Sequence, residues 1–121
     1  KMAEMQIRKT YKDINPELLH DQVRDFVQKY GATLDKAHLQ TYSLPGASAH
    51  MVRSTLTFKI RAKQEQAEKE CIRVHIIGSA VGETKMMLDI DDELFPQAKV
   101  SALEGDLDFI FGSFEVKPPK K

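Results

Sequence analysis

The chain of 121 residues lacks the cysteines that build disulfide frameworks and cysteine-rich zinc sites, and it lacks the long apolar runs that build membrane spans. It contains one cysteine and no tryptophan, and aromatic residues make up 7% of it. A lone thiol at Cys71 excludes an intrachain disulfide and a cysteine-rich zinc site. No apolar run approaches the ~20 residues that cross a bilayer. We therefore expect a protein without a membrane span and without a metal centre built on cysteine.

The chain also lacks an excess of charge of either sign. Eighteen basic residues balance eighteen acidic ones, so overall electrostatics do not favour nucleic acid or acidic lipid. The first residues contain no apolar signal region, and we expect a cytoplasmic location. The hydrophobic fraction of 41% is typical of a globular domain. We predict a single α+β domain over residues 1–116, followed by a flexible basic tail over residues 117–121.

The clearest predicted element is a helix that begins at Asn15-Pro16-Glu17. Asn15 can cap the first free amides, Pro16 suits the first helical position, and Glu17 complements the positive end of the helix dipole. An apolar stripe then recurs at helical spacing, and Gly31 is a natural end. The stripe consists of Leu19, Val23, Phe26, Val27 and Tyr30. Residues 5–11 before the helix predict a first strand.

The middle of the chain alternates between apolar and polar residues. Alternation over residues 52–62, 71–79 and 86–90 predicts three strands, each with one buried and one solvated face. Residues 32–42 predict a weaker strand, and Pro45-Gly46 and the glycines from Gly78 to Gly82 predict turns. Residues 64–69 are expected to form an exposed connection. Short links favour an antiparallel meander.

The last segment predicts a long amphipathic helix. Its apolar residues are spaced three, four, three and four apart, which is helical periodicity. They are Val100, Leu103, Leu107, Ile110 and Phe114. Gly105 and Gly112 would weaken such a helix, and residues 109–111 could form a strand instead. A ferredoxin-like fold with a C-terminal strand is therefore the alternative to an antiparallel sheet covered by a C-terminal helix.

Two stretches resemble the START-like superfamily, also called SRPBCC or Bet v 1-like. Residues 5–27 give a strand followed by a helix, and residues 81–115 contain a Gly82-Glu-Thr84 turn and a Leu103-Glu-Gly-Asp-Leu107 run. The two stretches cover under half of the chain. The resemblance implies a helix-grip fold, in which a curved sheet holds the C-terminal helix over an apolar cavity. The element order is also similar to that of a small family related to polyhydroxyalkanoate granules.

The resemblance implies a small binding protein for an apolar or amphipathic ligand. It carries no catalytic residue or cofactor onto this chain, and we expect a monomer or a homodimer. The same side chains would equally form a filled core. The expected pocket residues are Phe58, Val74, Ile76, Met86, Leu88, Leu103, Leu107, Ile110 and Phe114.

A basic sheet face supports an alternative function. Alternation places four cations on the solvated side of neighbouring strands, namely Arg53, Lys59, Arg61 and Arg73. Ribosome hibernation factors have a similar element order, so this face could dock RNA or an acidic protein. No aromatic side chain accompanies the cations to stack on bases. Solvated charge is the favoured interpretation, and we expect no nucleic acid partner.

Other candidate sites are weaker. His20, His38, His50 and His75 have no metal-ligand spacing. Acidic residues over positions 89–93 favour a cap on the following helix, with Asp92 or a neighbour as the cap. A small-residue stripe of Ala98, Ala102, Gly105 and Gly112 favours close approach of another backbone, either that of the sheet or that of the same helix in a second subunit. An enzyme with Tyr42, His75 or Asp89 at a cavity rim is the third hypothesis, although strand alternation places these side chains away from the cavity.

Overall fold

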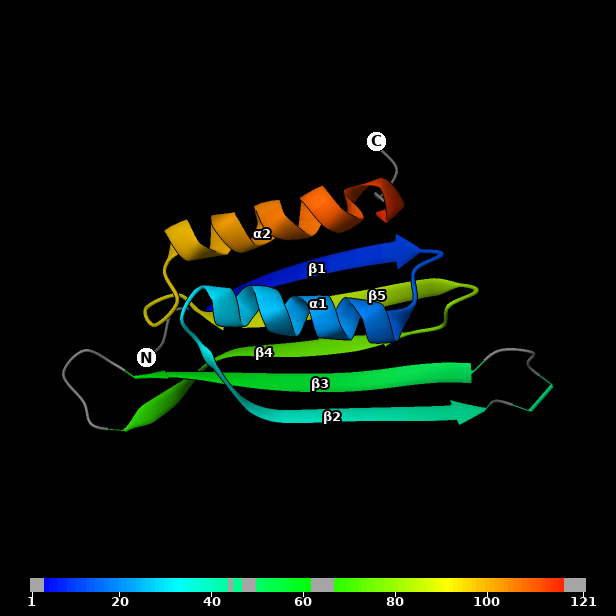
Figure 1. Ribbon diagram of the computed structural model, residues 1–121, viewed down its shortest axis with the longest axis horizontal. Coiled ribbons are helices and arrows are strands. Elements are labelled where there is room, and N and C mark those ends of the chain that lie inside the picture. Colours follow the sequence, from blue (N-terminus) through cyan, green and yellow to red (C-terminus); the bar gives the residue numbers. More distant parts are fainter. Residues whose placement is uncertain (1–3, 44, 47–49, 62–66, 117–121) are drawn as a thin grey trace.

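The computed structural model describes residues 4–43, 45–46, 50–61 and 67–116. It confirms the α+β class and the terminal helix (Figure 1). The elements are β1 (Glu4–Lys12), α1 (Pro16–Lys29), β2 (Thr33–Ser43), β3 (His50–Arg61), β4 (Glu68–Gly78), β5 (Glu83–Asp91), α2 (Gln97–Phe111) and the short 3-10 helix η1 (Gly112–Phe114). The predicted tail over residues 117–121 and residues 64–66 of the predicted connection lie outside the described residues.

One five-stranded sheet has the order β1-β5-β4-β3-β2, and its neighbouring strands are antiparallel. Strands β3, β4 and β5 form the predicted meander, β2 joins it beside β3, and β1 joins it beside β5. Both helices cover the same face of the sheet (Figure 1). Helix α1 packs over β3 and β4, and α2 runs beside it over β1. No helix of the described residues lies on the opposite face of the sheet.

Helix α1 begins and ends as the sequence predicts. The Asn15 side chain accepts a 2.8 Å hydrogen bond from the amide of Glu17, and Pro16 occupies the first turn. Gly31 has φ of +99°, a conformation that glycine adopts without steric cost. The apolar stripe faces the sheet, with Leu19 and Val23 fully buried. Local signals and tertiary packing therefore agree in this segment.

Helix α2 also forms, but its buried stripe ends at a different residue from the one predicted. Val100, Leu103, Leu107 and Phe111 are buried, and Ile110 is 44% exposed. Positions three and four residues after Leu107 both lie near the buried face, so spacing alone does not choose between Ile110 and Phe111. The Phe111 ring packs on Tyr11 of β1 with ring centroids 5.9 Å apart.

The alternative C-terminal strand is reduced to one bridge. Glu115 pairs with Tyr11, and the amide of Val116 donates to the carbonyl of Thr10 at 2.7 Å. The chain therefore returns to the free edge of β1 only after the helix has ended.

The prediction about the start of α2 was wrong. The acidic cluster does not cap the helix, because α2 begins after Pro96 without a side-chain cap. Asp91 instead accepts a 3.1 Å hydrogen bond from the amide of Glu93 in the preceding turn. The small-residue stripe brings no described backbone close, because Ala98 is exposed and a Cβ added at Gly105 would meet nothing within 4 Å. This side of α2 faces solvent.

The predicted hairpin between β4 and β5 is present. Gly78 lies opposite Thr84 in the ladder, and a Cβ at Gly78 would lie 2.5 Å from the Cα of Thr84. Glycine is needed here because the two backbones approach so closely. Among the described helices, none combines the length and the apolar character needed to cross a bilayer.

Candidate functional site

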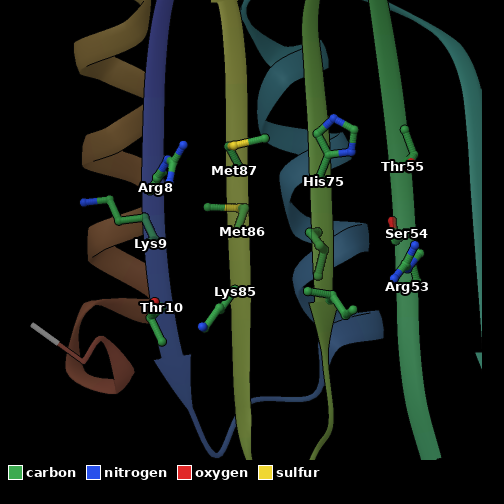
Figure 2. Close-up of a pocket in the computed structure, with 12 residues that line it drawn as sticks. Arg8, Lys9, Thr10, Arg53, Ser54, Thr55, His75, Lys85, Met86 and Met87 are labelled. Atoms are coloured by element: carbon green, nitrogen blue, oxygen red, sulfur yellow. The ribbon is translucent and has the colours of Figure 1, made fainter.

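The candidate site lies on the helix-free face of the sheet, which we call the open face. Successive side chains of a strand point to opposite faces, so each strand contributes to both. Arg8, Met87, His75 and Thr55 lie opposite one another on β1, β5, β4 and β3, and they form one row across the open face (Figure 2). This row is assembled from four segments that are distant in the sequence.

A second row runs beside the first. Thr10 pairs with Lys85, Lys85 with Ile77, and Ile77 with Arg53. Each row therefore contains an apolar side chain near the middle of the sheet and a cation towards one or both sides. Met87 and Ile77 belong to adjacent strands and supply the apolar part.

These rows border an open groove with a volume of about 730 Å³. Its lining residues are Arg8, Lys9, Thr10, Arg53, Ser54, Thr55, His75, Ile76, Ile77, Lys85, Met86 and Met87. Four of them turn their side chains to the helix-covered face and contribute through the strands on which they lie, namely Lys9, Ser54, Ile76 and Met86. The other eight present side chains to the open face.

The side chains that line the groove carry positive charge. Its described lining contains no aspartate or glutamate. Within the described part of the chain, Arg8, Arg53 and Lys85 form no ion pair. The Arg8 Nε donates to the Gln6 side chain at 2.8 Å. An anion in the groove would therefore meet cations that are not already paired.

Lys9, whose side chain lies on the helix-covered face, differs from these cations because it is ion-paired. Its side chain is 13% exposed, and its ammonium lies 3.7 Å from Asp108, 3.7 Å from Glu115 and 3.9 Å from Glu104. Two of these carboxylates belong to α2, so Lys9 fastens the helix to β1. The charge of Lys9 is therefore already paired with carboxylates of the protein itself.

The structure places only one of the four cations of the predicted basic face in the groove. Arg53 lines it, whereas Arg73 makes two 3.0 Å hydrogen bonds to Glu70 and Lys59 pairs with Asp35 at 3.3 Å. Arg61 lies at the end of β3 and is exposed. The sequence did not reveal Arg8 and Lys85 as groove residues, because their place beside Arg53 depends on the pairing of β1 with β5. Alternation of β1 and β5 was visible in the sequence, but their pairing was not.

The predicted pocket residues lie on the helix-covered face. Seven belong to the buried core, and Ile110 and Phe114 are 44% and 43% exposed. The buried seven are Phe58, Val74, Ile76, Met86, Leu88, Leu103 and Leu107. They pack against one another and against the apolar side of α1. The 730 Å³ groove lies on the other side of the sheet from them.

The potentially reactive side chains of the core are not exposed as nucleophiles. His20 Nδ1 and Ser54 Oγ lie 2.5 Å apart between α1 and β3, and both residues are buried. Burial lowers the pKa of His20, the largest cause being loss of solvation. Burial also raises the pKa of Cys71 to about 11, which disfavours the thiolate. Among the described residues, no group of three His, Cys, Asp or Glu side chains converges on a metal position.

Comparisons of the chain with protein-family models, with curated proteins and with solved structures found no significant match. The START-like assignment therefore stays a prediction from the sequence.

Proposed function

We propose that the protein binds an amphipathic organic anion in the open-face groove and performs no chemistry on it. The observation that carries this proposal is the combination in one hollow of Met87 and Ile77 with three cations that form no ion pair among the described residues. Its volume of about 730 Å³ falls within the range of about 300–1,000 Å³ that is common for small-molecule sites. The cations would hold an acidic headgroup, and the two apolar side chains would contact the body of the ligand.

A small ligand fits the groove better than RNA does. The described lining contains no phenylalanine, tyrosine or tryptophan on which a base could stack. The net charge of zero gives no long-range attraction to a polyanion. The proposal keeps the amphipathic ligand expected from the START-like resemblance but moves it to the open face. A START-like site between the sheet and the helices remains a competing hypothesis.

Calorimetric titration with dodecanoate, and with uncharged dodecanol as the comparison, tests the proposal. We expect one-site binding of dodecanoate that weakens as salt is added, because salt screens the exposed cations. The double variant Arg53→Ala/Lys85→Ala should bind at least ~10-fold more weakly, which corresponds to the loss of about 1.4 kcal/mol. Lys29→Ala/Arg24→Ala removes the same two residue types from α1, on the other side of the sheet, and should bind within about twofold of the wild type, since cations away from the ligand contribute little.

The opposite pattern of variants would overturn the proposal. Unchanged binding by Arg53→Ala/Lys85→Ala would show that the groove does not hold the headgroup. Binding that is lost instead in Met86→Trp would place the ligand between the sheet and the helices, because Met86 is buried on that side. Absence of dodecanoate binding together with salt-sensitive binding of a structured RNA would favour the nucleic acid alternative.

A further inference from the structure

Strand β2 is exposed on both faces. Ten of its eleven residues are exposed, and Leu34 alone is half-buried. Leu39 lies opposite the buried Ser54 and therefore points to the helix-covered side, whereas His38 lies opposite Thr55 on the open side. Helix α1 lies over the neighbouring strands and leaves β2 beside it uncovered (Figure 1). A regular strand with so little cover is unusual, because strands normally gain stability from packing at least one face.

The outer edge of β2 is also unpaired in the described structure. β2 is the last strand of the sheet order, so its second row of amides and carbonyls points away from β3. The opposite edge of the sheet is treated differently. There β1 is bridged by Glu115, it accepts a hydrogen bond from Val116, and Lys9 turns a charge inward. These are features that prevent an edge strand from pairing with another chain.

β2 has few such features. Its register irregularity lies between Leu34 and Lys36, and pairing with β3 is then continuous to Ser43. Residues 36–43 contain no proline and one formal charge, Lys36. This leaves a nearly neutral run whose outer hydrogen-bonding groups have no strand partner among the described residues.

We propose that β2 pairs with β2 of a second copy, antiparallel about a two-fold axis at Leu39. This arrangement joins the two five-stranded sheets into one continuous sheet. Leu39 meets its own copy on the helix-covered side, Lys36 lies opposite Tyr42 of the second copy, and His38 lies opposite Gln40. In this register each pair shares one face of the sheet, and the two Lys36 ammonium groups lie at opposite ends of the interface. Parallel pairing would place the two charges side by side, which is unfavourable.

A second copy suits this edge because residues 36–43 place apolar side chains and charges in matching positions when two copies pair antiparallel. The half-exposed apolar side chains Leu39 and Tyr42, each 38% exposed, both gain a partner in this register. The proposal uses the edge of β2 and not the groove, so it stands independently of ligand binding.

Sedimentation equilibrium of the full chain tests the pairing. We expect a concentration-dependent shift from the 13.8 kDa chain mass to twice that mass. Leu39→Lys places two like charges opposite each other at the axis and should return the protein to a monomer. Val81→Lys introduces the same charge at a residue that is 72% exposed in the turn between β4 and β5, and it should leave the dimer unchanged.

A cysteine placed on the axis tests the register. In the proposed register, Leu39→Cys should form an intersubunit disulfide under mild oxidation, because residues directly opposite in antiparallel strands have Cα atoms about 4.5–5.5 Å apart. Thr33→Cys, at the far end of the strand, should not form one. Circular dichroism of each variant checks that it is folded.

Two results would overturn the proposal. One is a wild-type protein that remains monomeric at every concentration reached. The other is a dimer that survives Leu39→Lys but dissociates in Phe109→Lys. The latter would place the interface on the solvent-facing side of α2, where Phe109 is 88% exposed.

Discussion

The two faces of the sheet are built from the same strands but have opposite chemistry. The helix-covered face presents fully buried side chains such as Leu56, Val74 and Leu88, which pack under the two helices. The open face presents Arg8, Lys85 and other polar groups around a groove. Because adjacent residues of one strand serve different faces, folding stability and the proposed ligand binding depend on different residues. Substitutions on the two faces should therefore affect different measurements.

Neither face is uniform in character. The covered face contains the buried His20–Ser54 pair and the Tyr11 hydroxyl, which has no hydrogen-bond partner among the described residues. Burial, with the carboxylate of Glu115 as the next cause, raises the pKa of Tyr11 well above its ordinary value. The open face contains Met87 among its cations. Substitutions at such positions, His20 among them, test the difference between the two faces most directly.

The largest effect is expected from Leu107→Ala on the covered face. Leu107 is fully buried on α2, and its truncation removes apolar contacts and leaves a cavity. We expect the free energy of unfolding to fall by about 2–5 kcal/mol. Urea denaturation followed by circular dichroism measures the change. Phe109→Ala on the solvent side of the same helix is the matched control and should change it by less than about 0.5 kcal/mol. Equal effects of the two variants would show that α2 does not pack as described.

A smaller effect, with a distinct pH dependence, is expected from His20→Ala. Loss of the buried hydrogen bond to Ser54 should cost about 1–3 kcal/mol at pH 7.5. Burial lowers the pKa of His20 in the folded state, so the unfolded state takes up a proton first as pH falls. Stability linked to His20 is therefore complete above the ordinary histidine pKa of about 6.5 and is lost as pH falls from there towards the folded-state pKa.

Unfolding free energies at several pH values between 7.5 and 5 separate this contribution from other titrations. We expect the wild type to lose stability over this interval by more than His20→Ala does. His38→Ala removes an exposed histidine and should keep the wild-type slope. Identical slopes for the wild type and His20→Ala would mean that His20 is not held in its neutral form by burial.

The smallest effect on stability is expected from Arg53→Ala on the open face. Arg53 is exposed and makes no ion pair within the described structure, so unfolding free energy should change by less than about 0.5 kcal/mol. Dodecanoate affinity should fall in the same variant. A loss of stability comparable to that of Leu107→Ala, measured by urea denaturation, would break the distinction between the two faces.

Much of the fold could be predicted because its signals are local. Asn15, Pro16 and Gly31 mark the ends of α1 within a few residues of the apolar stripe that they enclose. Alternation around Leu56 and Val74 assigns the buried side of β3 and β4 without knowledge of their partners. The start of α2 could not be predicted in this way. Asp91 caps the turn before the helix, and α2 begins only after Pro96, which the local sequence does not distinguish from a start next to the acidic cluster.

The sequence by itself determined the order of the elements, the buried side of β3, β4 and β5, and the presence of a terminal helix. These follow from periodicities of two and about 3.6 residues, which every segment carries alone. Tertiary structure decided which strands are neighbours, and therefore that Arg8 and Lys85 join Arg53 around one groove. It also decided that both helices cover one face, because α1 and α2 bury their apolar sides against the same layer of side chains. The pairing of strands and the placement of the helices depend on contacts between segments that are distant in the sequence, so no local sequence pattern predicts them.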